Sequence, residues 1–323
     1  MIRIALHGAN GHQIHNVLAA HPGVRLTALS AFPRESLPAT LRDDRTIREH
    51  PSLDSLLADP GVDFVSLCSP RRAGQAADAI RALRAGKHVL AEKPCAMNEE
   101  ELDAIIAAAR ATGRVFHEMA GTAFEQPYFA MREIVRSARL GEIVQVVAEK
   151  SYPYFDARPQ DEAADGGLVM QNAIHALRFV EHVAGAPIAS VSAVETTLGN
   201  PVAGGGLRMA ASLALTLRNG GIASIAANYL NPRGTGVWGD ESLRILGTRG
   251  IVESRGGGAF TRLVIGETDH GPLDTSGPGA PFLRAVFASI STGAPPPFTI
   301  DEELSPIRWA IRAKQSAVQR QRR

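Results

Sequence analysis

The chain has 323 residues, enough for one large domain or two ordinary ones, and two is the better expectation. Hydrophobic residues make up 45% and charged residues 21%, as in an ordinary globular protein. The formal charge of +1 gives no reason to expect nucleic acid or an anionic membrane as a partner. Two cysteines, Cys68 and Cys95, exclude a disulfide framework and favour a reducing compartment. With no signal peptide and no apolar run near the ~20 residues of a membrane span, the sequence predicts a cytoplasmic protein.

The chain begins with a strand predicted over residues 2–7, followed by a glycine-containing turn and a helix with Ile14, Val17 and Leu18 on one face. This arrangement directs backbone N–H groups and a helix N-terminus at a pyrophosphate. The residues expected to contact a dinucleotide in this turn are Gly8, Asn10, Gly11, His12 and Gln13.

The turn departs from the pattern Gly-x-Gly-x-x-Gly at two positions. Gly8 keeps the first glycine, whereas Asn10 and Gln13 replace the second and third. Asparagine is the non-glycine residue most tolerant of left-handed geometry, and Gly11 lies beside it, so the turn can still form. Gln13 is expected to hold the helix slightly farther from the strand.

The second predicted strand, residues 24–30, ends where an acidic residue would bind the ribose 2′-hydroxyl of NAD. Here the strand ends at Ser30, and Arg34 follows shortly after it. A missing acid with a nearby arginine suits a 2′-phosphate, so NADP is slightly favoured over NAD. The alternative is that Arg34 is a solvated loop residue and that the cofactor is NAD.

Strands and helices continue to alternate up to about residue 120, which indicates a doubly wound parallel sheet. We predict helices over 52–58, 75–85 and 98–112, and strands over 62–68, 88–91 and 115–117. Ser69 and Pro70 follow the third strand. They should lie at the edge where the carboxyl ends of the strands face the ligand, so we expect them to contact the cofactor.

Glu92, Lys93 and Pro94 follow the fourth strand at the same edge of the sheet. Proline fixes its own φ and disfavours helical geometry at Lys93, so the lysine should sit on a stiff, extended segment. We therefore interpret Glu92 and Lys93 as cofactor contacts and Lys93 also as a candidate catalytic ammonium. The alternative is that Lys93 is a surface lysine at the end of a strand.

Three segments of the chain resemble the Gfo/Idh/MocA family, which includes glucose-fructose oxidoreductase and inositol dehydrogenase. They are Ala-Gly-Lys-His-Val-Leu-Ala-Glu-Lys-Pro at 85–94, the stretch from Gly166-Gly167 to His175, and Leu-Gly-Thr-Arg-Gly at 246–250. The resemblance implies an α/β chain with an NAD(P)-binding Rossmann domain at 1–120. It implies a substrate-binding and oligomerisation domain at 121–323, of α+β type with a large, mostly antiparallel open sheet. The last helix, about 301–318, is expected to pack back on the first domain.

The chain departs from this family at two places. Members often carry Thr-Pro-Asn-x-x-His after the third strand, whereas this chain has Ser69-Pro70-Arg71-Arg72-Ala73-Gly74 and lacks the histidine. An Arg-Phe pair is common after the first domain, whereas this chain has Ala123-Phe124. The resemblance therefore supports the fold and does not identify a particular substrate.

Gln171 and His175 are four residues apart in a predicted helix, so they should share one face. The matching pair in the family is commonly Asp and His, which act with the lysine to bind and deprotonate a substrate hydroxyl. Gln171 cannot serve as a base, so we assign it an orienting role and assign proton transfer to His175 or Lys93. The alternative is a structural histidine bonded to a backbone carbonyl.

Strands dominate from residue 191 onward, with a two-residue hairpin turn at Asn219-Gly220. A sheet covered by helices on one face exposes apolar area on the other, so we predict a homodimer or homotetramer. His12 and His15 share a face but have no acidic or cysteine partner nearby, so no metal site is expected. The strands are predicted over 142–150, 191–197, 208–217, 222–229, 243–246 and 251–253, and further helices over 128–137, 281–292 and 301–318.

The leading hypothesis is an NAD(P)-dependent dehydrogenase or reductase acting on CH–OH groups. It would transfer a hydride between nicotinamide and a hydroxyl-bearing or carbonyl carbon of a sugar, cyclitol or related polyol. One alternative is an enzyme that uses bound NAD for elimination or glycoside cleavage without net redox change. The other is a non-enzymatic, dinucleotide-responsive binding protein, which the altered turn and Gln171 motivate.

Overall fold

A computed structural model describes residues 1–119 and 121–321, and the chain divides into two compact units. The first unit contains residues 1–119, 163–165 and 282–304, and the second contains the remaining described residues. Helix α9 (Ile300–Gln321) contributes its first residues to the first unit and the rest to the second. Each unit is described separately below.

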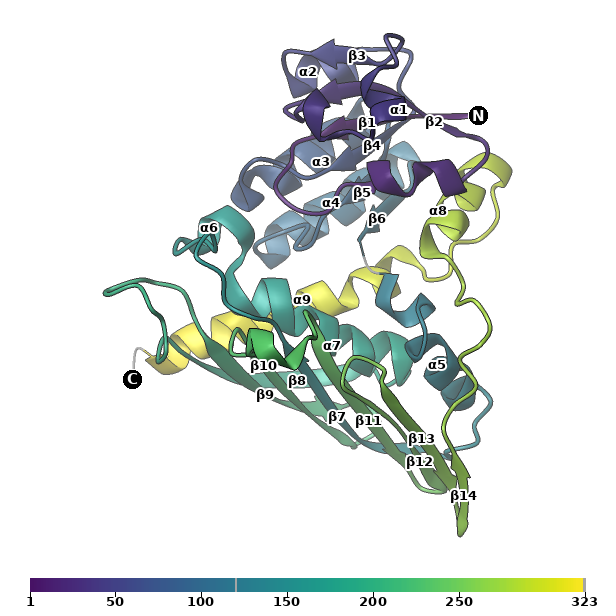
Figure 1. Ribbon diagram of the computed structural model, residues 1–323, viewed down its shortest axis with the longest axis vertical. Helices are drawn as coiled ribbons and strands as arrows, with labels where there is room; N and C mark the ends of the chain where they lie inside the picture. The colour runs from purple at the N-terminus through teal and green to yellow at the C-terminus, as the bar shows by residue number, and fades with distance from the viewer. Residues whose placement is uncertain (120, 322–323) are drawn as a thin grey trace. The chain divides into compact units, whose positions relative to one another are not determined.

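The first unit contains a six-stranded parallel sheet in the order β3-β2-β1-β4-β5-β6 (Figure 1). The predicted doubly wound parallel sheet is therefore confirmed. The strand order reverses between β1 and β4, and sheets of this kind bind ligands outside the carboxyl ends of the strands at such a point. The strands are β1 (Ile2–His7), β2 (Val24–Ser30), β3 (Arg48–His50), β4 (Phe64–Leu67), β5 (His88–Ala91) and β6 (Phe116–Glu118).

Helices of the first unit begin and end largely where their capping residues predict. Ser52 caps α2, and Asn98 caps α4 by accepting a 2.9 Å hydrogen bond from the Glu101 N–H. Gly113 ends α4 in the left-handed conformation at φ 62°. The helices are α1 (Ala39–Arg42), α2 (Leu53–Leu57), α3 (Gln75–Arg84), α4 (Glu99–Thr112) and α8 (Phe282–Thr292).

The prediction of a helix directly after the glycine turn is wrong. Two short 3₁₀ segments, Ile14–Asn16 and Leu18–Ala20, take its place. Val17, expected on the buried face, is 44% exposed. The stretch between Gln13 and the Pro22-Gly23 break is short, so it offers few helical hydrogen bonds to offset the cost of nucleating a helix.

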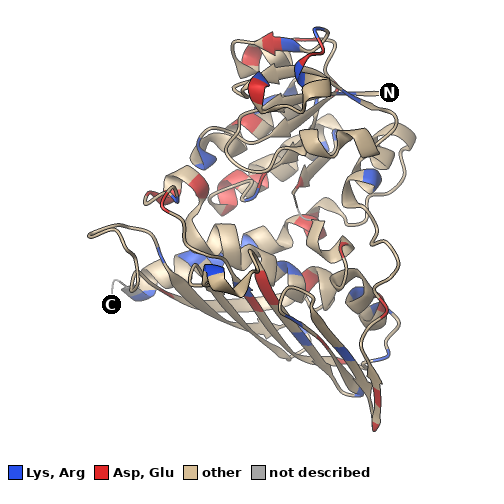
Figure 2. Cartoon of the chain, viewed as in Figure 1, with Lys and Arg blue, Asp and Glu red and all other residues tan. Residues whose placement is uncertain are grey.

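The second unit contains an eight-stranded sheet in the order β14-β13-β12-β11-β7-β10-β9-β8. Only the β10–β7 pair is parallel, so the predicted, mostly antiparallel open sheet is confirmed. Figure 2 shows that β9 and β10 carry no charged side chains. The strands are β7 (Ile143–Ser151), β8 (Ile188–Thr196), β9 (Ala210–Leu217), β10 (Ile222–Asn228), β11 (Asp240–Gly247), β12 (Gly250–Arg255), β13 (Phe260–Ile265) and β14 (Thr268–Gly271).

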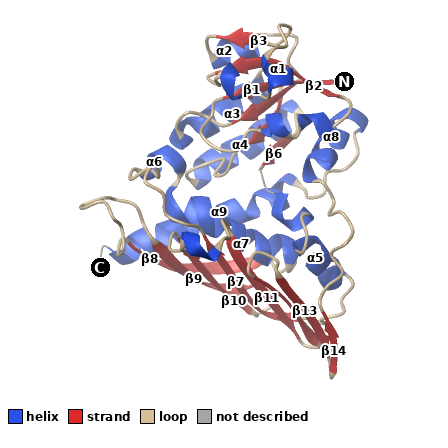
Figure 3. Cartoon of the chain, in the orientation of Figure 1, coloured by secondary structure: helices blue, strands red, loops and turns tan. Residues whose placement is uncertain are grey.

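Helices of the second unit gather on one face of this sheet (Figure 3). They include α5 (Tyr128–Arg136), α7 (Ile174–Arg178) and most of α9. Of the short α6 (Glu162–Asp165), only Glu162 belongs to the second unit. Buried and exposed residues alternate along β9 and β10, as expected for a sheet with one covered face. Within the described residues, no helix combines the length and apolar character that a membrane crossing requires.

Candidate functional site

The turn after β1 lies against the end of β4. Gly8 has φ 74°, and a Cβ atom added there would overlap the backbone carbonyl of Cys68. Only glycine fits this position, because both the backbone conformation and the space exclude a side chain. Gly11, with φ 128°, is the second glycine of the turn with a positive φ, which other residues rarely adopt. The expectation that Asn10 adopts left-handed geometry is wrong, since the positive φ values fall on the two glycines.

Asn10 has a different role, because its side-chain amide tethers the turn. The amide donates to the carbonyl oxygens of Pro70 at 3.2 Å and Ala164 at 2.9 Å. The Asn10 carbonyl in turn accepts a 2.5 Å hydrogen bond from the guanidinium of Arg72. At the position where a second glycine is expected, these contacts of Asn10 fix the conformation of the turn, and the conformational freedom of a glycine is not needed.

Gln13 also points inward and does not act as a spacer for a helix. Its Nε2 donates to the carbonyl oxygen of Gly8 at 2.8 Å and to that of His7 at 3.1 Å. Its Oε1 accepts a 2.6 Å hydrogen bond from the hydroxyl of Ser66 in β4. These contacts connect the turn to both central strands.

Glu92 binds the turn from the end of β5. Its carboxylate is 2% exposed and accepts hydrogen bonds from the backbone N–H and the ring Nδ1 of His12, and from the Lys93 N–H at 2.8 Å. Burial alone would raise the pKa of Glu92, but the hydrogen bonds from His12 and the Lys93 ammonium lower it to about 2. A Cβ on Gly11 would lie 2.5 Å from a Glu92 carboxylate oxygen, so this close approach also requires glycine.

Lys93 lies at the carboxyl end of β5 and is 7% exposed. The Lys93–Pro94 peptide bond is cis. Gln75, fully buried, donates from Nε2 to the carbonyl oxygens of Glu92 at 2.5 Å and Pro94 at 3.0 Å. The backbone on both sides of the lysine is therefore fixed by one amide side chain.

Sequence reasoning missed Gln75 and Arg72 as parts of this site. Arg72 is 1% exposed and donates to Gln75 Oε1 at 2.5 Å as well as to the Asn10 carbonyl. Burial lowers the pKa of the Arg72 guanidinium, and the Glu92 carboxylate opposes this effect. The Arg71-Arg72 pair at the start of a helix was a visible signal, but only the fold shows that Arg72 points inward.

Ser69 and Pro70 lie at the end of β4, beside the turn. The Ser69 hydroxyl donates to Asp78 at 2.8 Å, and its N–H donates to Gln75 Oε1 at 3.2 Å. Pro70 contributes the carbonyl oxygen that binds Asn10. These two residues therefore belong to the same hydrogen-bonded edge as the glycine turn.

The end of β2 is where a ribose would be bound. The Ser30 side chain is 3% exposed, and its hydroxyl has no hydrogen-bond partner within residues 1–119 and 121–321. A buried hydroxyl without a partner is costly, and a hydrogen bond to a ligand would remove this cost. Together with the turn that excludes side chains at Gly8, this residue fits a dinucleotide.

Arg34 is engaged within the protein. Its guanidinium donates to Glu49 Oε1 at 2.5 Å, to the carbonyl oxygens of Arg42 and Asp44 at 3.2 Å each, and to that of Ile47. Four of the five donors of an arginine side chain are used in this way. Arg34 therefore shapes the 42–47 loop, and its role toward a 2′-phosphate stays a prediction.

Gln171 and His175 lie in a continuous helical stretch of the second unit that is not regular. Residues Val169–Ala173 and Phe179–Val183 form π-helical turns on either side of α7. Between residues 165 and 184, only Gln171, His175 and Glu181 are not buried. The two predicted site residues therefore share the accessible side of the stretch, and π-helical turns are frequent at functional sites.

His175 contacts a group of side chains that sequence reasoning did not assign to the site. Tyr152 Oη lies 3.5 Å from His175 Nε2, and the two rings meet edge to face at 6.2 Å. The Lys150 ammonium lies 4.5 Å from the centre of the Tyr152 ring and forms an ion pair with Glu241. Burial raises the pKa of Tyr152, and the Lys150 charge opposes this effect. Within the described residues, no group of three His, Cys, Asp or Glu side chains could hold a metal ion.

Comparison with known proteins assigns both halves of the chain. Residues 2–119 match the family model described as "Oxidoreductase family, NAD-binding Rossmann fold", and residues 128–253 match the "GFO/IDH/MocA C-terminal domain". The structure is similar to that of aldose-aldose oxidoreductase from Caulobacter crescentus, with a TM-score of 0.81 and 24% identity over 100% of this chain and 98% of the other. At this identity the likeness shows the fold alone.

Two curated relatives match part of the chain. The 1-carboxy-3-chloro-3,4-dihydroxycyclohexa-1,5-diene dehydrogenase of Comamonas testosteroni is 30% identical over 52% of this chain and 43% of its own length. The trans-1,2-dihydrobenzene-1,2-diol dehydrogenase of Bos taurus is 32% identical over 42% of this chain and 40% of its own. The chain thus spans less than half of the length of these relatives. Because the two family models together cover most of the sequence, the chain belongs to the GFO/IDH/MocA family of oxidoreductases with an NAD-binding Rossmann domain.

Proposed function

We propose that this protein is an NAD(P)-dependent dehydrogenase or reductase that transfers a hydride between nicotinamide and a CH–OH or carbonyl carbon of a sugar, cyclitol or related polyol. The observation that carries the proposal is the buried Lys93 at the carboxyl end of β5, in a domain of the NAD-binding oxidoreductase family. The two curated relatives are named as dehydrogenases of ring compounds that carry neighbouring hydroxyl groups, which supports a hydroxyl-bearing substrate.

The residues of this chain would handle the proton of the reacting hydroxyl. When bound, the nicotinamide supplies or accepts the hydride. Lys93 would donate a hydrogen bond to the substrate oxygen and stabilise the negative charge that develops on it. His175 would exchange the proton, because an imidazole titrates near neutral pH, and Gln171 would orient the hydroxyl through its amide.

The cofactor would lie along the turn after β1. Gly8 and Gly11 leave room for the backbone to approach a pyrophosphate, and Ser30 offers a buried hydroxyl to the ribose. We keep NADP as the slightly favoured cofactor, although Arg34 is held by Glu49. The remaining support is a surface hollow lined by Arg34, Arg42, Asp43 and Arg45, whose net positive charge would attract a 2′-phosphate.

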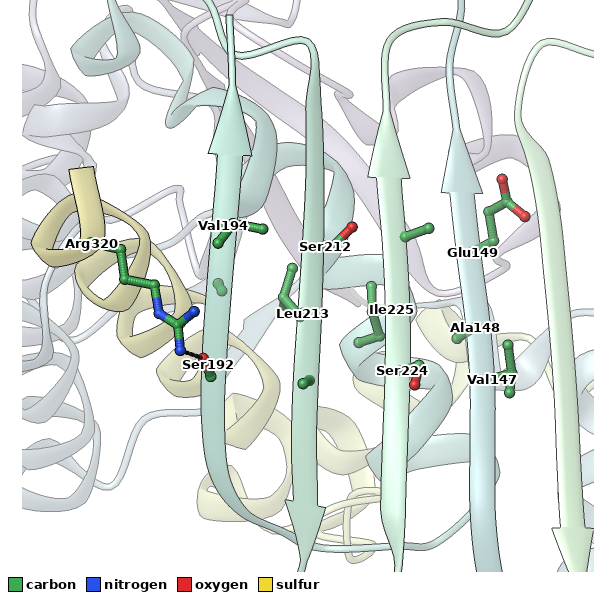
Figure 4. A pocket seen from close by; sticks show the side chains of 13 residues that line it. Val147, Ala148, Glu149, Ser192, Val194, Ser212, Leu213, Ser224, Ile225 and Arg320 are labelled. Atoms are coloured by element: carbon green, nitrogen blue, oxygen red, sulfur yellow. Dashed lines mark hydrogen bonds between the residues drawn. The ribbon is translucent and has the colours of Figure 1, made fainter.

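We also propose that the second unit forms a homodimer or homotetramer through the bare face of its sheet. Figure 4 shows a hollow on this face, where Val147, Val194, Ser212 and Ser224 project from neighbouring strands. Val147 and Val194 are 42% and 46% exposed, and the outward side chains of β9 and β10 are small or apolar. Glu149 and Arg320 border this hollow, and the exposed valines and small side chains between them form an apolar area of the kind that protein interfaces bury.

The decisive experiment is the substitution Lys93→Met, assayed with NAD, NADP and a panel of polyols and sugars. Reduced nicotinamide is followed by its absorbance, and cofactor binding is followed by calorimetry. We expect the wild-type protein to turn over at least one polyol and the variant to lose turnover by about 100-fold or more, while cofactor affinity changes only a few-fold. Turnover that survives in the variant would contradict the role of Lys93. Cofactor binding without turnover across the panel would instead favour a dinucleotide-responsive binding protein.

A further inference from the structure

Three aromatic side chains of the second unit, Tyr152, Phe155 and Trp238, form a continuous group that we call the aromatic wall. The Trp238 ring lies 6.3 Å from the Tyr152 ring and 6.0 Å from the Phe155 ring, between centroids. Trp238 is 60% exposed, although a tryptophan is usually highly buried. The wall therefore presents a large aromatic surface to a ligand or to solvent.

Cations on the protein side hold the wall in place. The Lys150 ammonium lies 4.5 Å from the Tyr152 ring centre, and the Arg158 guanidinium lies 4.4 Å from that of Phe155. Each of these contacts attracts the cation to the electron-rich face of the ring and fixes the orientation of that ring. Tyr152 and Phe155 thus use part of their surface inside the protein, and Trp238 carries the exposed part of the wall.

The wall continues to the candidate catalytic histidine. Tyr152 contacts Trp238 through its ring, and its hydroxyl lies 3.5 Å from His175 Nε2. Charged groups that can bind hydroxyls, Lys150 and Glu241, lie beside the same tyrosine. An apolar aromatic surface bordered by a few polar groups is the usual composition of a small-molecule site.

We propose that the aromatic wall binds one apolar face of a ring-shaped substrate and selects cyclic polyols and diols over open-chain ones. A pyranose, a cyclitol or a cyclic diol presents C–H groups in a flat array that can stack on an indole, while its hydroxyls point to the rim. An open-chain polyol has no such fixed face and would lose conformational freedom on stacking. The proposal rests on the proposed function, because it specifies the substrate of the same site.

The chain allows a direct binding test because it has two tryptophans, and the other one, Trp309, is 7% exposed. Intrinsic fluorescence is recorded without added cofactor, so that no turnover occurs, while myo-inositol, methyl glucopyranoside, trans-cyclohexane-1,2-diol or the open-chain hexitol sorbitol is added. The signal of Trp238 is the difference between the wild-type protein and the variant Trp238→Phe. We expect at least one ring compound to change this signal with an affinity about ten-fold higher than that of sorbitol.

A kinetic test uses Trp238→Ala and, as a matched control, Phe260→Ala, which removes another exposed aromatic ring of the same unit. Trp238→Ala should raise the KM for the ring substrate about ten-fold and leave the values for open-chain polyols within about two-fold. Phe260→Ala should change neither.

The two proposals fail in different ways. A Trp238 signal that responds to no ring compound, or responds equally to sorbitol, overturns the aromatic wall even if the enzyme turns over polyols. Equal KM changes for ring and open-chain substrates also overturn it. A wild-type protein that binds ring compounds at Trp238 but never reduces NAD or NADP supports the wall and contradicts the proposed function.

Discussion

Replacing Glu92 with glutamine tests the electrostatic link between the end of β5 and the dinucleotide turn. The carboxylate is 2% exposed, and its contacts lower its pKa from 4.5 to about 2. This difference corresponds to about 3 kcal/mol of preference for the ionised form in the folded protein. We expect Glu92→Gln to lower the free energy of unfolding at pH 7 by up to about 3 kcal/mol. The loss will be smaller where the glutamine oxygen keeps the hydrogen bonds from His12.

The effect of pH has a defined sign. A carboxyl group with a lowered pKa in the folded state contributes stability above its unfolded pKa and loses it as pH falls toward its folded pKa. The difference between the wild-type protein and the variant should therefore be nearly constant above about pH 5.5 and be smaller by about 0.4 kcal/mol at pH 4.5. By pH 3.5 it should have shrunk by about 1.4 kcal/mol.

Urea denaturation followed by circular dichroism measures both quantities. Tryptophan fluorescence is unsuitable here, because Trp238 and Trp309 both lie in the second unit and Glu92 lies in the first. Amide hydrogen exchange at His12, whose N–H is bound by Glu92, gives a local readout, and exchange should be faster in the variant. An unchanged His12 exchange rate, or a stability difference that does not vary between pH 7 and pH 3.5, would refute the reasoning.

Three further predictions concern other parts of the chain. Gly8→Ala should weaken dinucleotide binding at least ten-fold by calorimetry, because the added Cβ would overlap a backbone carbonyl. The control Gly74→Ala should not weaken binding, because the space around its Cβ is open. Equal effects of the two substitutions would contradict the packing argument. If the surface hollow beside Arg34 binds a 2′-phosphate, Arg45→Gln should weaken the binding of NADP about five-fold and leave the binding of NAD unchanged. An equal loss of affinity for both cofactors would exclude this phosphate site. Size-exclusion chromatography with light scattering should show a dimer or tetramer for the wild-type protein. Val147→Glu would bury a charge in the proposed interface and should give the 34.3 kDa single chain. A wild-type protein that is a single chain would contradict the proposed interface.

The sequence predicts the alternating strands and helices of the first unit well, and also the strands β7 to β12 of the second. Both follow from hydrophobic periodicity and capping residues, which are local signals. It misses β3, which has three residues, and the β13–β14 hairpin beyond Gly256 to Gly258. It also predicts a helix after the glycine turn where the chain makes two 3₁₀ segments.

The candidate site is less predictable because it depends on partners that are far apart in the chain. Glu92 binds a residue 80 positions earlier, and Arg72 binds one 62 positions earlier. Spacing rules cannot reveal such pairs, although the residues at the carboxyl ends of the strands could be assigned to one edge. The contact of Tyr152 with His175 follows only from the packing of a strand end against a helix, which no local pattern in the sequence reveals.

The π-helical turns on either side of α7 have a consequence for comparing this protein with its relatives. A π-helical turn accommodates one residue more than an α-helical turn, so removing one residue from Val169–Ala173 would restore α-helical geometry. Because the π-helical turn takes up the extra residue, such a deletion would leave the helix before it and the helix after it in nearly the same orientation. A deletion at Asn172 or Ala173 would, however, place Gln171 and His175 three positions apart instead of four. An alignment that places a gap in this stretch therefore changes which residue stands opposite the histidine.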